Sequence, residues 1–353
     1  MKKLFLSLFA LAAATMSYAQ SSVLATLSHE GEISTFYGAG ALKEAHAAAE
    51  HGDVITLSSG SFQATDITKA VTIRGAGMQV DSIAQIYPSV VVGGFKIDVP
   101  DSLEQHLTVE GIYCDNNTVT VHHTLSNATF IKSRFYKFRS LCQTGNTGFM
   151  KNLAFIHCKI QDYFLNYNGG NSISFVNSLI MNPYIGDSPF PNNSFEFTNC
   201  VVRWTGVLVY NEAWPKYSYY AIYRNCILSS SSTSDSYNKM SSTNLIYNCL
   251  GIASTNLFAN IAALGSSMFY TTTDMAEVFK TWTGEISELE TYELTDEAKT
   301  KYLGDDGKEL GIYGGNLPFT PNPTNPKITK FNVASKSTAD GKLSVDIEVK
   351  AAE

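Results

Sequence analysis

The chain has 353 residues, of which 44% are hydrophobic and 16% are charged, and its formal net charge is −7. This composition is apolar enough to build a sizeable core, which excludes an intrinsically disordered chain. The charge is modest and no basic run occurs, so we expect no nucleic-acid partner.

The first 19 residues have the three parts of a secretory signal peptide. Two lysines follow the first methionine, an apolar run ends at Ala14, and Ser17-Tyr18-Ala19 is a small-x-small cleavage site. The run is too short to remain as a membrane span, and no other segment is expected to cross a bilayer. We therefore expect cleavage after Ala19 and a protein in the periplasm, secreted, or on the outer surface of a Gram-negative bacterium. Residues 20–39 follow as an N-terminal lead-in.

A short helix is predicted from Gly40 to His51. Small apolar residues recur at helical spacing through this range, and Gly52 follows as a stop signal. We expect His46 and His51 to be exposed on this helix rather than to bind a ligand.

Strand-like runs follow the helix in a distinctive phrase. The sequence reads AAAEHGDVITL at 47–57, SGSF at 59–62 and VTIRGAG at 71–77. This phrase resembles the opening of pectin-lyase-like right-handed parallel β-helices, in which an amphipathic helix covers the open end of a solenoid. The resemblance covers roughly residues 40–315, and we expect the solenoid to span residues 40–320. This resemblance covers the scaffold only, because the arginine motif of the lyases, the Asp-Asp and Gly-His-Gly phrases of the hydrolases and the paired Asp motifs of the esterases are not found.

One short phrase recurs between residues 107 and 252. Each copy has an aromatic or apolar residue, then in most copies Asn, and then Cys or Ser, with apolar residues after it. The Cys or Ser positions, 20–26 residues apart, are Ser133, Cys158, Ser178, Cys200, Cys226 and Cys249. This period, with alternating apolar residues and abundant β-branched and aromatic ones, predicts an all-β fold. Together with the resemblance, it predicts a right-handed parallel β-helix with a short N-terminal capping helix.

Two side-chain ladders are predicted from the stacking of coils. Equivalent residues of successive coils lie about 4.8 Å apart, so we expect the Asn amides to bond to one another at an inward bend. The Cys and Ser residues would form a second ladder. Export permits disulfides, but parallel side chains one coil apart do not face each other, so we expect buried free thiols that pack as small hydrophobes.

His122 and His123 are adjacent in the sequence. Neighbouring residues of a strand face opposite sides of the sheet, so we expect that these two do not share a metal ion and that the chain has no metal site.

The loops between coils combine aromatic and polar residues, and the segment from Trp204 to Tyr220 is the richest. Aromatic rings beside amides and carboxylates hold sugars by stacking and by hydrogen bonds. The candidate ligand-binding residues are Trp204, Tyr210, Asn211, Glu212, Trp214, Lys216 and Tyr217. The alternative is that these rings pack on the outer wall of the solenoid.

A basic group made of Lys132, Arg134, Lys137 and Arg139 is the candidate anion-binding site. It could hold an acidic polymer or supply the base for β-elimination from a uronate; the alternative is a solvated outer face without a ligand. Hydrolysis would need paired carboxylates on neighbouring coils, and no clear pair occurs between residues 107 and 252.

The C-terminal part is predicted to close the solenoid. A helix is expected around 275–282, and residues 303–315 resemble the closing coil of exported bacterial β-helices. Asp305-Asp306-Gly307 leaves a calcium loop as an alternative, although the spaced carboxylates of such loops are missing; no other cofactor is expected. Residues 321–326 are a Pro-rich linker, and 327–353 alternate as a β-hairpin.

Three functions stay open. The favoured one is an exported, non-catalytic β-helix protein that binds polysaccharide or cell-surface polymers. The alternatives are a divergent polysaccharide lyase or hydrolase that acts on acidic glycans, and an adhesin with a protein partner. Whether the chain is an enzyme is not decided by the scaffold, because a fold does not carry a function.

Overall fold

The structure of the protein is a computed structural model. It describes residues 23–81, 87–101, 104–140, 150–166, 172–185, 194–204, 221–231, 240, 242–259, 261, 269–271, 274–282, 291–323, 327–333, 340–342 and 344–350.

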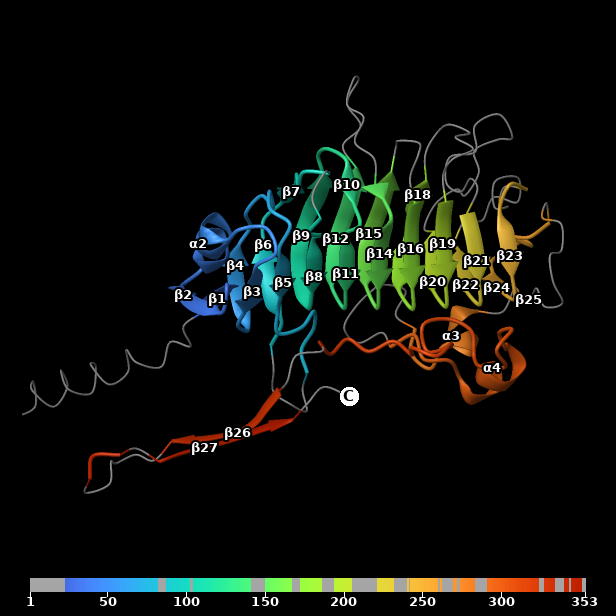
Figure 1. Cartoon of the computed structure of the whole chain (residues 1–353). Helices are drawn as coiled ribbons and strands as arrows, with labels where there is room; N and C mark the ends of the chain where they lie inside the picture. The colour runs from blue at the N-terminus through green and yellow to red at the C-terminus, as the bar shows by residue number, and fades with distance from the viewer. Residues whose placement is uncertain are drawn as a thin grey trace, which may run out of the picture.

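The described residues form a parallel β-solenoid, which confirms the predicted all-β fold and its parallel stacking (Figure 1). Two long sheets run along it, and the chain alternates between them as it advances. In spatial order, the first sheet contains β2 (Glu32–Tyr37), β1 (Leu24–His29), β3 (Val54–Leu57), β5 (Thr72–Arg74), β8 (Thr108–Glu110), β11 (Thr129–Ile131), β14 (Leu153–Ile156), β16 (Ser172–Val176), β19 (Ser194–Thr198), β21 (Ala221–Arg224) and β23 (Leu245–Tyr247).

The second sheet faces the first across the core. In spatial order it contains β4 (Gly60–Gln63), β6 (Ser89–Val92), β9 (Ile112–Val121), β12 (Arg134–Ser140), β15 (Lys159–Asn166), β17 (Leu179–Met181), β20 (Val201–Trp204), β22 (Ile227–Ser230), β24 (Leu250–Ile252) and β25 (Phe269–Thr271). Short strands extend it at one margin: β7 (Phe95–Ile97) pairs with β9, and β18 (Pro183–Ile185) pairs with β15. A separate pair is formed by β10 (Leu125–Ser126) and β13 (Met150–Lys151).

A sharp corner joins each strand of the first sheet to the next strand of the second. The corner residue has a left-handed backbone, with φ of 43° at Asn177, 51° at Asn199, 53° at Asn225 and 48° at Asn248. Asn tolerates this conformation better than most residues, which explains why it recurs in the repeat.

The residue after each corner points into the core and forms the predicted Cys/Ser ladder. The backbone N–H of Cys200 lies 3.4 Å from the Cys226 Sγ, and the Cys226 N–H lies 3.4 Å from the Cys249 Sγ. The described cysteines are buried and free, as predicted, and burial raises the pKa of the Cys158 thiol to about 12. They therefore act as packing groups; Cys142 lies outside the described residues.

Aromatic rings on the first sheet stack from coil to coil through the centre of the core. Ring centroids are 4.8 Å apart between Phe130 and Phe155, 5.0 Å between Phe155 and Phe175, 4.8 Å between Phe175 and Phe197, and 4.7 Å between Phe197 and Tyr223. The spacing equals the distance between strands, so these five coils have an aromatic ring at the same register.

The predicted capping helix is α2 (Ala41–Ala48), and it lies at the N-terminal end of the solenoid (Figure 1). It buries Ala41, Leu42 and Ala45. The prediction that its histidine is exposed is wrong for His46, which is 5% exposed and accepts the Thr68 N–H at 3.3 Å; His51 is exposed, and accepts the Ala70 N–H at 3.0 Å. The lead-in adds the antiparallel hairpin of β1 and β2 to the first sheet.

The C-terminal part contains α3 (Met275–Val278) and α4 (Asp296–Lys301) and covers part of the outer face of the second sheet. Outward-facing Leu179, Val201, Ile227 and Leu250 pack with residues of this part in a second apolar core. The predicted closing coil is therefore wrong, because no described residue of 291–323 forms a strand of either sheet.

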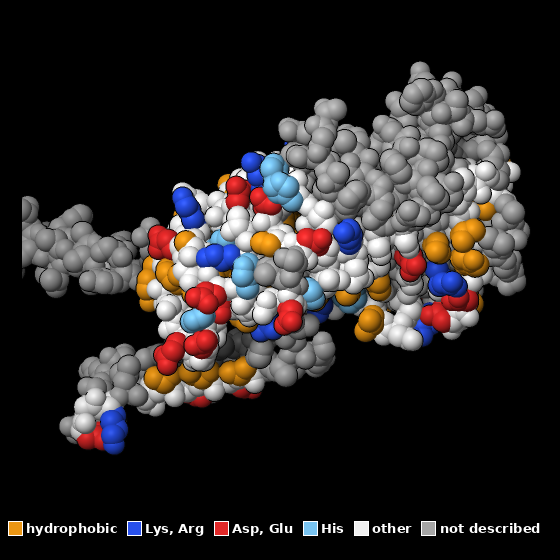
Figure 2. Space-filling model, turned by 45° about the horizontal axis from the view of Figure 1, so that its top comes forward, with side chains coloured by type: hydrophobic (Ala, Val, Ile, Leu, Met, Phe, Trp, Pro, Cys, Tyr) orange, Lys and Arg blue, Asp and Glu red, His pale blue; other side chains and the backbone are white. Residues whose placement is uncertain are grey.

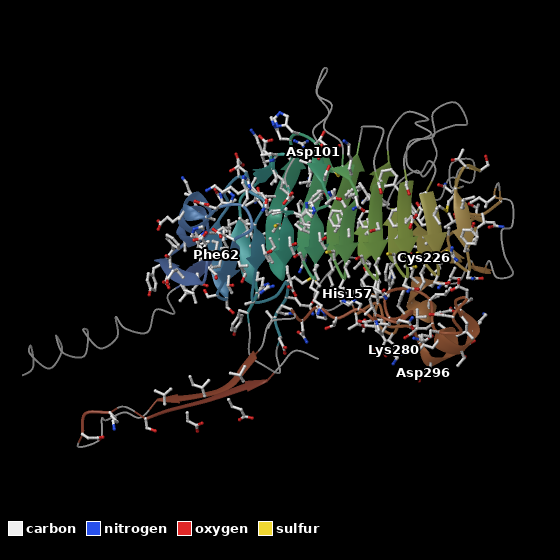
Figure 3. The ribbon with its side chains drawn as sticks, viewed as in Figure 1. Phe62, Asp101, His157, Cys226, Lys280 and Asp296 are labelled. Carbon is white, nitrogen blue, oxygen red and sulfur yellow. The ribbon has the colours of Figure 1, made fainter. Side chains whose placement is uncertain are left out.

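Residues 303–323, which we call the C-terminal strap, instead run back along the corners of the coils. Asn177 Nδ2 donates to the carbonyls of Ile312 and Gly314 at 2.8 and 2.9 Å, and Asn225 Nδ2 donates to Asp305 at 2.7 Å. Both amides thus donate to the strap, whereas the sequence predicted that each would bond to the Asn of the next coil. Further along, the Leu317 carbonyl lies 3.0 Å from the ring Nε2 of His157, which Figure 3 shows on the side of the solenoid that faces the strap.

The predicted C-terminal hairpin is present as β26 (Lys327–Val333) and β27 (Val345–Lys350), paired antiparallel. Its face includes the exposed residues Val345, Ile347 and Val349 (Figure 2). Within the described residues, no helix is long and apolar enough to span a membrane.

Candidate functional site

A groove lies between the outer face of the second sheet and the segment that contains α3. Its volume is about 410 Å³, and its described lining residues are Arg203, Ser229, Ser230, Ser231, Ile252, Ala253, Ser254, Asp274, Met275 and Trp282. The floor is one column of the sheet: Arg203 pairs with Ser229, and Ser229 pairs with Ile252. Because side chains alternate along a strand, this column faces outward while Val202 and Leu228 face the core.

Arg203 and Trp282 form the charged end of the groove. The Arg203 guanidinium carbon lies 4.6 Å from the centre of the Trp282 ring, in a cation–π contact. The indole also stacks on Phe279, with ring centroids 6.0 Å apart. The stack orders a flat guanidinium whose donors are arranged for hydroxyl or carboxylate groups.

Serine side chains give the groove its polar character. Ser229 is 3% exposed, and its hydroxyl has no hydrogen-bond partner among the described residues. A buried hydroxyl without a partner costs free energy that a bound polar group would recover. Ser229 therefore adds a buried polar group to the floor of the groove.

The far wall of the groove is held by ion pairs. Glu293 accepts from Lys280 at 2.7 Å and from Lys299 at 2.9 Å, which ties α3 to α4 (Figure 3 labels Lys280). Both lysines hold the pKa of Glu293 at about 2, so the carboxylate stays charged in ordinary buffers. Asp274 caps α3 by accepting the Ala276 N–H at 3.2 Å.

The prediction that Trp204 is a ligand-binding residue is wrong. The indole is 1% exposed, packs at the edge of Tyr223 and donates its N–H to the Pro183 carbonyl at 3.3 Å, so it has no face for a sugar. Tyr210, Asn211, Glu212, Trp214, Lys216 and Tyr217 lie outside the described residues. The sequence did not predict the groove, although Arg203 on its floor immediately precedes the predicted ligand-binding segment that begins at Trp204.

The predicted basic group is not brought together as one anion site. Arg134 is 7% exposed, stacks on Tyr113 at 4.5 Å and donates to Gln161 at 2.8 Å. Lys137 pairs with Asp162 at 3.1 Å. Arg139 contacts the Thr120 hydroxyl at 3.4 Å. Each of these side chains of β12 thus has its own partner.

Lys132 stands apart from the other three, because it occupies a corner position with φ of 46°. It is 6% exposed, and burial lowers the pKa of its amine, which the nearby Glu110 opposes. It is therefore part of the buried corner rather than of a solvated outer face.

Asp98, His122 and His123 form a cluster at another edge of the solenoid. The prediction that the two histidines face opposite sides is wrong, because β9 ends at Val121 and both rings turn to the same carboxylate. Their Nδ1 atoms lie 3.4 Å apart, and His123 Nδ1 contacts an Asp98 oxygen closely.

The predicted calcium alternative finds no support at Asp305. Its carboxylate accepts from Asn225 at 2.7 Å and from Arg224 at 3.2 Å. Asp306 accepts the N–H of Lys308 at 3.0 Å. These carboxylates stabilise the strap.

Comparisons of the chain with family models, with curated proteins and with solved structures find no match.

Proposed function

We propose that the protein is an exported, non-catalytic β-solenoid that binds a polysaccharide or cell-surface glycan in the groove between the second sheet and α3. The observation that carries the proposal is the lining of this groove, where the Ser229 hydroxyl, neighbouring serines, the ordered Arg203 guanidinium and Asp274 meet. Sugar hydroxyls pair with hydroxyl, guanidinium and carboxylate groups. The signal-peptide pattern that ends at Ala19 supports the export in this proposal.

The lining favours binding over hydrolysis. Glycoside hydrolysis needs two carboxyl groups on opposite sides of the scissile bond, and Asp274 is the one carboxylate among the described lining residues of the groove. Asp274 also serves as the N-cap of α3. A bound chain would therefore be held without being cut.

Affinity electrophoresis tests the proposal. Purified protein is run in native gels cast with neutral or acidic polysaccharides, with Arg203→Ala and Ser229→Val as groove variants and Tyr87→Ala as the control. Tyr87 is 64% exposed and does not line the groove. We expect one polymer to retard the wild type and the control equally, and Arg203→Ala to weaken binding at least tenfold, which is about 1.4 kcal/mol.

Three results would contradict the proposal. If both groove variants have the thermal unfolding curve of the wild type and still bind the polymer as the wild type does, the site lies elsewhere. Shortening of the polymer during the run would show an enzyme. Absence of retardation by every polymer would leave a protein partner as the better explanation.

A further inference from the structure

The edge formed by β7 and β9 brings together three side chains that suit a metal ion. β7 pairs in parallel with the second half of β9, so that Phe95 lies beside Val119 and Ile97 beside Val121. Continuing this register places Asp98 beside His122, and the His122 N–H donates to the Ile97 carbonyl at 3.0 Å. Coil stacking thus joins residues that are about 25 positions apart in the sequence.

The atoms of this cluster converge on one point. One ligand atom from each of Asp98, His122 and His123 lies within 4.8 Å of the others. The two Nδ1 atoms are 3.4 Å apart, and His122 Nδ1 is 3.9 Å from Asp98 Oδ2. Tetrahedral ligands with Zn–N bonds of about 2.0–2.1 Å are themselves roughly 3.3–3.4 Å apart, so the spacing of the two nitrogens already matches such a site.

A hydrogen bond between Asp98 and His123 would account for only part of this arrangement. It needs one histidine, whereas the second ring also directs Nδ1 to the same point, with the two rings edge to face and their centroids 4.6 Å apart. A neutral imidazole has one nitrogen with a lone pair and one with a proton. A cation lets both Nδ1 atoms offer lone pairs, and the Asp98 carboxylate balances part of its charge.

We propose that Asp98, His122 and His123 bind a borderline divalent cation, with Zn²⁺ as the expected ion. Two imidazoles and one carboxylate suit zinc and its neighbours in the first transition row, whereas calcium and magnesium prefer all-oxygen sites. Side-chain exposures of 27% for His122, 59% for His123 and 38% for Asp98 leave the remaining coordination positions open to solvent. Figure 3 shows the same edge of the solenoid, where it labels Asp101, three residues after Asp98. Water, or a donor atom of a bound molecule, completes the coordination.

Calorimetric titration with zinc chloride tests the site, using full-length protein without a histidine tag. The variants are Asp98→Asn and the double change His122→Ala/His123→Ala. His106→Ala is the matched control, because His106 is an exposed histidine outside the cluster. We expect one zinc per chain in the wild type and in the control, and at least a hundredfold weaker binding in the double variant. Cobalt(II) should give the strong visible absorption of tetrahedral coordination by nitrogen and oxygen.

Other results would overturn the assignment. If the double variant binds zinc with wild-type affinity, the ion binds elsewhere. If the wild type binds no zinc, the proposed site does not exist. Calcium that competes with zinc at equal concentration would show an oxygen site rather than this one. Thermal unfolding is also measured without metal. Equal unfolding temperatures in all four proteins show that a loss of zinc binding is not caused by a loss of fold.

Discussion

At the scale of single residues, the corner of each coil combines two requirements. The corner needs a left-handed backbone, and the next position needs a small side chain that fits the core. Asn225 and Cys226 satisfy them in one coil, and Asn177 and Ser178 in another, where both Cys226 and Ser178 are fully buried. Because Cys and Ser are both small, either residue fits this position of the ladder without disturbing the spacing of the coils.

His46 makes the stability of the capping helix depend on pH. Burial, aided by the nearby Lys69, lowers the pKa of His46 to about 4 from its usual 6.5. As the pH falls, His46 therefore binds a proton near pH 6.5 in the unfolded chain but only near pH 4 in the folded chain. Stability is complete above about pH 6.5 and falls as the pH is lowered toward 4, by about 2 kcal/mol at pH 5 from this residue.

Urea unfolding at pH 7 and pH 5 measures this loss. His46→Gln is neutral at both values and keeps an acceptor for the Thr68 N–H, so we expect its free energy of unfolding to change less between the two pH values than that of the wild type. His157, whose pKa burial also lowers, contributes equally to both proteins. The same pH dependence in both would show that His46 does not titrate in this way.

Two of the residue-scale predictions that failed have a reason in the strands themselves. Arg203 faces outward, so alternation along β20 turns Trp204 into the core, and this signal was present in the sequence. His122 and His123 escape the same alternation because their strand ends at Val121. The position of Asp98 beside them depends on the length of the intervening coil, which no local pattern shows.

At the scale of elements, the repeat predicted the solenoid well because every coil contains the same signals. The capping helix could also be predicted from the sequence, because a short amphipathic run that ends before Gly52 is a local pattern. The C-terminal strap was not predicted. Its partners lie far away in the chain, as the contact of Ile312 with Asn177 shows over 135 positions, and the corner amides gave no sign that they bind backbone carbonyls rather than one another.

Gly315 is the position where the strap meets the corners most tightly. It has φ of +74°, and a Cβ atom there would collide with the amide of Asn199. Gly307 has φ of +73° in the same strap, with nothing within 4 Å of such an atom. Both changes to Ala impose a similar backbone strain of about 1–2 kcal/mol, so their difference reports the collision.

We expect Gly315→Ala to lower the free energy of unfolding by about 2 kcal/mol more than Gly307→Ala, because overpacking adds roughly 1–3 kcal/mol. Urea unfolding gives the two values, and limited proteolysis shows whether the strap is released. Equal losses in the two variants would mean that the strap is not held against Asn199.

At the scale of the whole molecule, the solenoid presents different surfaces along one axis. The corners are covered by the strap, and part of the outer face of the second sheet is covered by the apolar contacts of the C-terminal part. The groove remains where Arg203 and Ser229 continue beyond that cover. The histidine cluster lies at the edge of β7 and β9, on coils nearer the N-terminus.

Hydrogen exchange with and without the retarding polymer tests most directly whether the groove is the binding surface. Bound polymer should slow exchange in peptides that cover 201–204, 227–231, 250–254 and 274–282, while β8, β11 and β14 of the opposite sheet keep their rates. Protection confined to the opposite sheet or to the strap would contradict the account, because the groove would then face away from the ligand.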